Sequence, residues 1–236
     1  MTARIARFGA VFAALLLSTS AAGAAGRAVT FSAPDGTTLA GMFYESSNRS
    51  APAVVLVHML ARSKDEWIPL AERLQESGAT VLTFDLRGHG GSSGSASALP
   101  PMVSDVRSAV EWLTTRAPNR PSSIGLVGSS LGANLAALAA ADLASVRAVA
   151  LISPSLDYRG IRLDQAVMKK LGARPVFLAS STEDPYALRT IQELAAQGGA
   201  REQRLSTSHA HGTALLAADP DLAVSLVDWL RRTLIF

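Results

Sequence analysis

Short apolar segments alternate with amphipathic segments along most of this chain, and this alternation limits the fold more than any other feature. Five apolar runs each predict a buried strand, at 53–57, 80–84, 124–128, 148–152 and 175–179. Helical periodicity lies between them, as in the apolar stripe made by Trp67, Leu70, Ala71 and Leu74. Strands that alternate with helices predict a mostly parallel sheet with helices on both faces.

Three further segments complete the predicted sheet. Two β-like runs, 29–32 and 39–44, flank the turn signal Pro34-Asp35-Gly36 and predict an opening hairpin. A short strand is expected at 204–206, which makes eight strands in an α/β fold. A final helix should begin after Asp219, a candidate N-cap followed by Pro220.

The N-terminus has the layout of a secretory signal peptide. Arg4 and Arg7 precede the apolar run 8–17, and small residues fill 18–26. We expect a leader at 1–24, cleaved after Ala24, and one domain at 25–236. The run is shorter than the roughly 20 residues of a spanning helix, which favours a cleaved leader over a membrane anchor. An uncleaved leader that acts as an N-terminal anchor is the second interpretation. The two arginines are not adjacent, which favours the general secretory route and a periplasmic or secreted protein.

Charge and cysteine content exclude several classes of function. The formal net charge is +3, and without Arg4 and Arg7 the chain has 20 basic and 19 acidic side chains. No basic run is interleaved with aromatic residues, so no nucleic-acid partner is expected. The chain has no cysteine, which excludes disulfides, thiolate metal sites, a cysteine nucleophile and a lipoprotein anchor.

The segment 123–132 marks Ser130 as a candidate nucleophile. It matches G-x-S-x-G, with Gly128 and Gly132 on either side of Ser130, between an apolar strand and a small-residue helix. A serine on such a sharp turn has a strained backbone, and the residues two positions away must be small so that strand and helix can approach closely.

Partners for this serine follow later strands. A serine hydroxyl needs an imidazole that accepts its proton, and the imidazole needs a carboxylate that fixes its tautomer. Asp184 and His211 both lie in loops after predicted strands, with Glu183 and His209 as the competing residues. The pair His209-x-His211 could also bind a metal, but no third ligand accompanies it at suitable spacing.

Four motifs together resemble the α/β-hydrolase fold family, in particular its small capless branch that includes dienelactone-hydrolase-like esterases. They are 54–58, 85–90, 128–132 and His211-Gly212, and the resemblance extends over the chain after the leader. The chain departs from the family pattern in having Met59 after His58 and Ser181 at the start of the acid loop. Its nucleophile is a serine instead of cysteine, so dienelactone hydrolysis is not implied.

The resemblance implies a role for each site residue. Ser130, Asp184 and His211 form a catalytic triad, and the backbone N–H groups of Leu131 and Leu60 form the oxyanion hole. Met59 is the alternative donor. His58, Asp85 and His89 are interpreted as structural residues of the loops at the edge of the sheet. No cofactor and no metal are expected.

The expected reaction is hydrolysis of a small carboxylic ester through an acyl-enzyme. The segment 153–174 is too short for a large cap, which predicts an open site bordered by Met59, Leu60, Leu156 and Tyr158. Met59, Leu156 and Tyr158 are the predicted substrate contacts. A serine peptidase or amidase on the same fold and a non-catalytic binding protein are the alternatives.

Mass spectrometry tests the leader. We expect the intact mass of the exported protein to correspond to a chain that begins at residue 25. A mass that includes residues 1–24 would support the uncleaved anchor instead.

Overall fold

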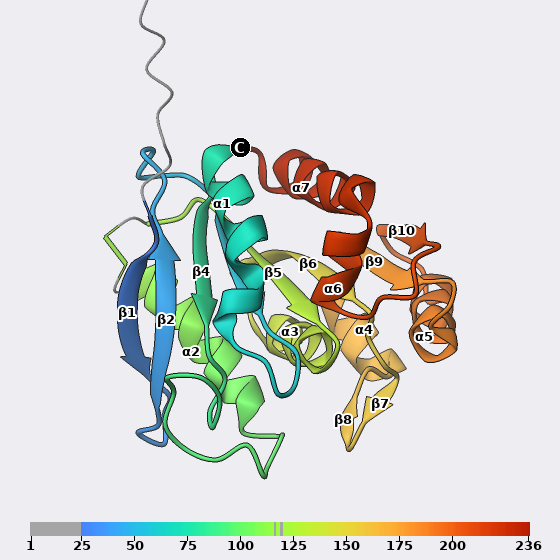
Figure 1. Cartoon of the computed structure of the whole chain (residues 1–236), viewed down its shortest axis with the longest axis horizontal. Helices are drawn as coiled ribbons and strands as arrows, with labels where there is room; N and C mark the ends of the chain where they lie inside the picture. The colour runs from blue at the N-terminus through green and yellow to red at the C-terminus, as the bar shows by residue number, and fades with distance from the viewer. Residues whose placement is uncertain (1–24, 116, 119) are drawn as a thin grey trace, which may run out of the picture.

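The computed structural model describes residues 25–236 except 116 and 119, so the predicted leader lies outside the described residues. Eight strands form one sheet in the order β1-β2-β4-β3-β5-β6-β9-β10 (Figure 1). Only β2 runs antiparallel to its neighbours β1 and β4. The strands are β1 (Arg27–Ser32), β2 (Thr38–Tyr44), β3 (Ala53–Val57), β4 (Thr80–Phe84), β5 (Ile124–Ser129), β6 (Val146–Ile152), β9 (Val176–Ser181) and β10 (Arg201–Ser206).

Helices cover both faces of the sheet, as the alternating pattern predicts. Residues of α2 and α3 pack in one apolar cluster, and residues of α1 and α7 pack in a second cluster on the opposite face. The helices are the 3₁₀ helix η1 (Lys64–Trp67) and α1 (Ile68–Glu76), α2 (Met102–Thr115), α3 (Leu131–Asp142), α4 (Gln165–Leu171), α5 (Pro185–Ala196), α6 (Thr213–Ala218) and α7 (Pro220–Leu234).

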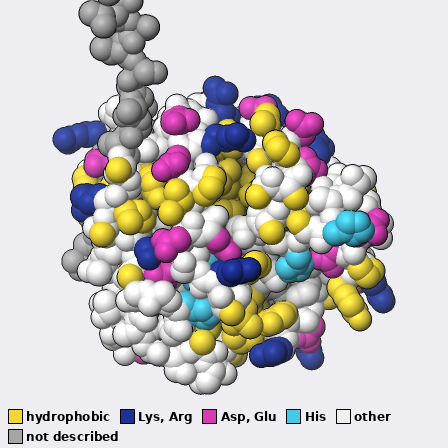
Figure 2. Space-filling view, viewed as in Figure 1, with side chains coloured by type: hydrophobic (Ala, Val, Ile, Leu, Met, Phe, Trp, Pro, Cys, Tyr) yellow, Lys and Arg dark blue, Asp and Glu magenta, His cyan; other side chains and the backbone are white. Residues whose placement is uncertain are grey.

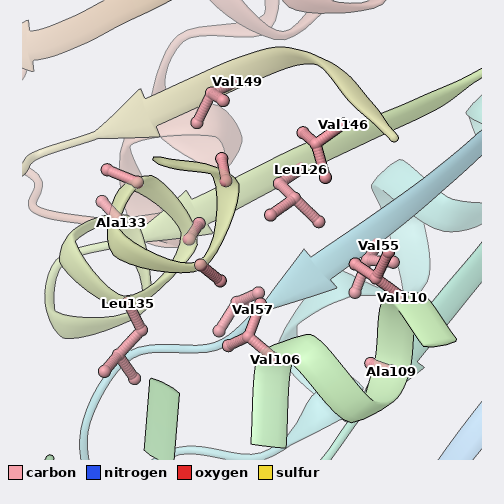
Figure 3. Close-up of a cluster of buried hydrophobic side chains, with 14 of the residues drawn as sticks. Val55, Val57, Val106, Ala109, Val110, Leu126, Ala133, Leu135, Val146 and Val149 are labelled. Carbon is pink, nitrogen blue, oxygen red and sulfur yellow. The ribbon is translucent and has the colours of Figure 1, made fainter. Parts of the chain in front are cut away.

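The two-residue period of each strand divides its side chains between these clusters. In β3, Val55 and Val57 belong to the cluster with α2 and α3, whereas Val54 and Leu56 belong to the cluster with α1 and α7. Figure 3 shows Val55 and Val57 beside side chains of α2, α3, β5 and β6. A strand that is apolar at every position is therefore buried on both sides, which is why the central strands were recognisable.

The fold class and the eight-stranded sheet are confirmed, with differences at the strand ends. β10 begins at Arg201, three residues before the predicted start, because its first residues are polar and exposed or half-buried at the sheet edge and carry no apolar pattern. Within 153–174 the chain forms a ribbon of β7 (Asp157–Tyr158) and β8 (Ile161–Arg162) and then α4, which the sequence pattern did not predict. Strands of two residues are too short to give a periodic signal.

The predicted start of the last helix is also confirmed. Asp219 caps α7, because its Oδ1 accepts a hydrogen bond of 3.0 Å from the Leu222 N–H, and Pro220 is the first helical residue. Among the residues that the structure describes, no helix has the length and apolar character needed to cross a membrane.

A buried ion pair joins the loop after β4 to α2. The guanidinium of Arg87 donates to Asp105 through Nη2 at 2.7 Å and through Nε at 3.0 Å. Asp105 is fully buried, and the Arg87 side chain is 8% exposed. Arg87 also donates to Asp35 in the β1–β2 turn at 2.6 Å, so one side chain links three segments of the chain.

Removing this guanidinium should destabilise the fold strongly. Arg87→Met leaves the Asp105 carboxylate buried without its charge partner, and we expect it to lower the free energy of unfolding by about 3–5 kcal/mol. Urea unfolding measures the change. Arg162→Met, which removes an exposed pair with Asp157, is the matched control and should leave the midpoint almost unchanged. Equal effects of the two substitutions would contradict this account.

Candidate active site

Ser130 lies on a sharp turn between β5 and α3, as predicted. Its backbone angles are φ 51° and ψ −118°, a conformation that few residues other than glycine adopt. A Cβ on Gly128 would lie 2.2 Å from the Gly132 carbonyl oxygen, and a Cβ on Gly132 would lie 2.3 Å from the Val57 carbonyl oxygen. Both glycines are therefore needed for strand and helix to approach this closely.

The fold brings Ser130, His211 and Asp184 together from three separate loops. His211 Nε2 lies 2.9 Å from Ser130 Oγ, and His211 Nδ1 lies 2.5 Å from Asp184 Oδ2. Because the carboxylate is an acceptor, Nδ1 carries the proton and Nε2 is free to accept the serine hydroxyl proton. The second carboxylate oxygen of Asp184 accepts from the Ala187 N–H at 3.1 Å and so caps α5. The arrangement can activate the serine as a nucleophile.

The glycine after His211 is required by close packing. Gly212 has φ 64°, and a Cβ there would lie 2.7 Å from both Met59 Sδ and Ser129 Oγ. Its N–H donates to Ser153 Oγ at 3.0 Å, so Ser153 holds the loop that carries His211. The sequence pattern does not mark Ser153, whose only signal is its place directly after a buried strand.

The competing residues do not join this hydrogen-bonded chain. Glu183 is exposed, and its N–H donates to Ser181 Oγ at 2.9 Å. His209 is exposed as well. In the described part of the chain, no three His, Asp or Glu side chains converge in a group that could hold a metal ion. The His211 side chain is 47% exposed, so the site is open to solvent, and histidines reach the surface in Figure 2.

The loop after β3 holds its backbone through side chains of other segments. Met59 N–H donates to Glu66 Oε1 at 3.0 Å, and Ala61 N–H donates to His89 Nε2 at 3.2 Å. Between them, Leu60 N–H has no acceptor among the described residues, and the same is true of Leu131 N–H at the start of α3. Of the two predicted donors in this loop, Met59 is thus already occupied.

His58 and His89 each have one protonated and one accepting nitrogen. His58 Nε2 accepts from the Leu86 N–H at 2.9 Å, so its Nδ1 carries the proton and donates to the Met59 carbonyl at 2.8 Å. His89 likewise accepts at Nε2 and donates from Nδ1 to the Arg87 carbonyl at 3.0 Å. Both rings connect the loop after β3 to the loop after β4, which agrees with their structural interpretation.

Asp85 connects the same two loops through a different set of bonds. Its Oδ1 accepts from the Lys64 N–H at 2.7 Å, and its Oδ2 accepts from Lys64 Nζ at 2.9 Å. These bonds lower the pKa of Asp85, although burial opposes the shift. The start of η1 is thereby fixed next to the loop that carries Met59 and Leu60.

The predicted substrate contacts lie in two places. Met59 is half-buried, and its sulfur packs against Gly212, beside His211. Leu156 and Tyr158 are half-buried and pack against the apolar cluster with α2 and α3. Contact of all three with substrate stays a prediction.

A cavity of about 230 Å³ lies between α1, α6 and α7, with Glu66 and Thr213 in its wall.

The protein thus has an α/β fold with a mostly parallel sheet. Ser130, His211 and Asp184 lie together at the carboxyl edge of this sheet. A family model described as alpha/beta hydrolase fold matches residues 52–196. The chain therefore belongs to the α/β-hydrolase fold family.

Similar proteins were found by sequence and by structure. Rv2307c of Mycobacterium tuberculosis is 37% identical over 113 residues, which are 48% of this chain and 40% of that protein. YfhR of Salmonella typhimurium is 34% identical over 148 residues, which cover 56% of this chain and 50% of that protein. This chain thus spans about half or less of these relatives. The Pyrococcus furiosus esterase Pf2001 has the same fold, with a TM-score of 0.76 at 20% identity over 89% of this chain and 91% of that one.

Burial of His58 should make stability depend on pH. Burial lowers the pKa of His58 from its ordinary 6.5 to about 4. The unfolded chain therefore binds a proton that the folded chain does not as the pH falls from 6.5 to about 4, and stability decreases over that range. Between pH 7 and 4.5 the loss from this residue should be about 2–3 kcal/mol.

Urea unfolding at several pH values tests this expectation. His58→Gln should remove that part of the pH dependence, whatever its effect at neutral pH. The same substitution at exposed His209 is the control and should keep the wild-type dependence. An unchanged dependence in His58→Gln would contradict the assignment.

Proposed function

We propose that this protein is a serine hydrolase that cleaves carboxylic esters through an acyl-enzyme. The observation that carries the proposal is the hydrogen-bonded chain from Asp184 through His211 to Ser130, with the serine on a strained turn at the start of α3. Family membership and a structural neighbour named an esterase support hydrolase activity.

In the first half of the proposed reaction, Ser130 Oγ attacks the ester carbonyl and His211 Nε2 takes its proton. The carbonyl oxygen becomes an oxyanion, which the N–H groups of Leu60 and Leu131 stabilise. When this intermediate collapses, the carbon–oxygen bond to the alcohol breaks and the imidazolium returns its proton to the leaving alkoxide. Asp184 stabilises the imidazolium while it exists.

In the second half, water replaces the alcohol. His211 removes a proton from the water, which attacks the acyl carbon and forms a second oxyanion in the same position. Collapse of that intermediate breaks the bond to Ser130, and His211 protonates Oγ. The acid product leaves and the enzyme returns to its starting state.

The surroundings favour small ester substrates. His211 is 47% exposed, and the chain between β6 and β9 adds only the β7–β8 ribbon and α4. Met59 directly precedes the proposed oxyanion donor Leu60, and its sulfur packs against the histidine loop at Gly212. With Leu156 and Tyr158 it is proposed to contact the acyl or alcohol group. From the predicted leader alone, we propose that the activity lies in the periplasm or outside the cell.

Substitution of the triad residues tests the function. With nitrophenyl esters of increasing acyl length as substrates, Ser130→Ala should abolish turnover. Asp184→Asn should lower kcat by roughly 10⁴-fold, because the histidine then loses the partner that fixes its tautomer. A fluorophosphonate should label wild type at one site per chain and should not label Ser130→Ala.

The same assays separate the alternatives. Cleavage of aminoacyl-nitroanilides without ester cleavage would favour a peptidase or amidase. A folded wild type that neither hydrolyses any ester nor reacts with the fluorophosphonate would favour a binding protein. Full activity in either variant would overturn the assignment of the triad. Glu183→Gln, beside the acid but outside the hydrogen-bonded chain, is the matched control.

A further inference from the structure

We propose that Glu66 is a positioning residue of this site: its carboxylate occupies the Met59 N–H and so leaves the Leu60 N–H as the donor to the oxyanion. The inference rests on the proposed function. Glu66 is the last residue but one of η1, seven positions after Met59, and no part of the predicted site included it.

Three of the four backbone N–H groups of residues 59 to 62 already have acceptors. Glu66 Oε1 accepts from Met59 N–H at 3.0 Å, and the Met59 carbonyl accepts from His58 Nδ1 at 2.8 Å and from Arg62 N–H at 3.3 Å. Ala61 N–H donates to His89 at 3.2 Å. Of the N–H groups of residues 59 to 62, the one of Leu60 alone has no acceptor in the described part of the chain.

The backbone directly after Leu60 is strained. Ala61 has φ 59°, in the left-handed region that alanine rarely adopts. A strained peptide of this kind persists only where its neighbours hold it. His89 holds the Ala61 side of Leu60 and Glu66 holds the Met59 side. A donor fixed in advance needs no reorganisation when negative charge develops, which is the property an oxyanion hole requires.

Glu66 lies between two loops of the site. Its Oε1 accepts from the Met59 N–H, and Glu66 lines the same cavity as Thr213, two residues after His211. Burial raises the pKa of Glu66, and the hydrogen bond from the Met59 N–H opposes the shift. Glu66 thus holds the loop with the proposed oxyanion donor and lies across a cavity wall from the start of α6, which follows the proposed base.

The role depends on reach and on an accepting oxygen, and it does not depend on charge. Glutamine at this position keeps an acceptor at the same distance from the backbone. Aspartate keeps the charge but is one methylene shorter, so its oxygens are withdrawn from Met59. The two substitutions therefore separate a positioning role from a purely electrostatic one.

The test compares Glu66→Gln, Glu66→Asp and Glu66→Leu with wild type on the nitrophenyl ester that wild type hydrolyses best. We expect Glu66→Gln to keep most of kcat. Glu66→Asp and Glu66→Leu should lower kcat by about 10- to 100-fold with little change in KM, because the transition state loses a well-placed donor. Their fluorophosphonate labelling should slow by a similar factor. Glu72→Asp, at an exposed position of α1, is the matched control and should behave as wild type.

Thermal unfolding of each variant separates positioning from folding, and Glu66→Asp keeps the test valid if Glu66→Leu does not fold. Wild-type kcat in a folded Glu66→Asp, or an equal loss in Glu66→Gln and Glu66→Asp, would overturn the role of Glu66 alone. Absence of turnover in wild type itself would overturn the proposed function, and the role of Glu66 with it.

Discussion

The close approach of β5 and α3 at Ser130 is the contact on which the rest of the site depends. A Cβ built on Gly128 would lie 2.2 Å from a backbone oxygen, and a Cβ built on Gly132 would lie 2.3 Å from another. No side chain therefore fits at either position. This contact forces Ser130 into a conformation with positive φ and places its hydroxyl at the carboxyl edge of the sheet. Every partner of the serine must then reach the same edge.

Parallel strand order supplies those partners. β5, β6 and β9 are neighbours in the sheet, and β9 pairs with β10, so the loops that follow them lie at one edge. Ser130, Ser153, Asp184 and His211 all come from these loops. Two hydrogen bonds hold the histidine. The His211 ring bonds to Asp184, and the N–H of the next residue, Gly212, donates to Ser153 Oγ. The geometry of the serine site is thus a property of the sheet as much as of the motif.

The loop after β3 follows a different principle. Four side chains from outside the strand fix it or the residues just after it: His58, Glu66, Asp85 and His89. Histidines suit this task, since each gives one donor and one acceptor to backbone groups of the two loops. The family pattern has glycine where this chain has Met59, and the Met59 sulfur fills the space beside Gly212.

The sequence by itself determined the alternation of strands and helices, the elbow at Ser130 and the order of serine, acid and histidine. Such features depend on local periodicity and on small residues at fixed spacing, which a single chain displays directly. Tertiary structure alone decided the start of β10, the β7–β8 ribbon and the bonds of Glu66 and Ser153. A polar edge strand has no apolar pattern, and a hydrogen bond between distant segments leaves no local trace. Tertiary contacts with Glu66 and His89 likewise decided that, among the described residues, the Leu60 N–H has no acceptor.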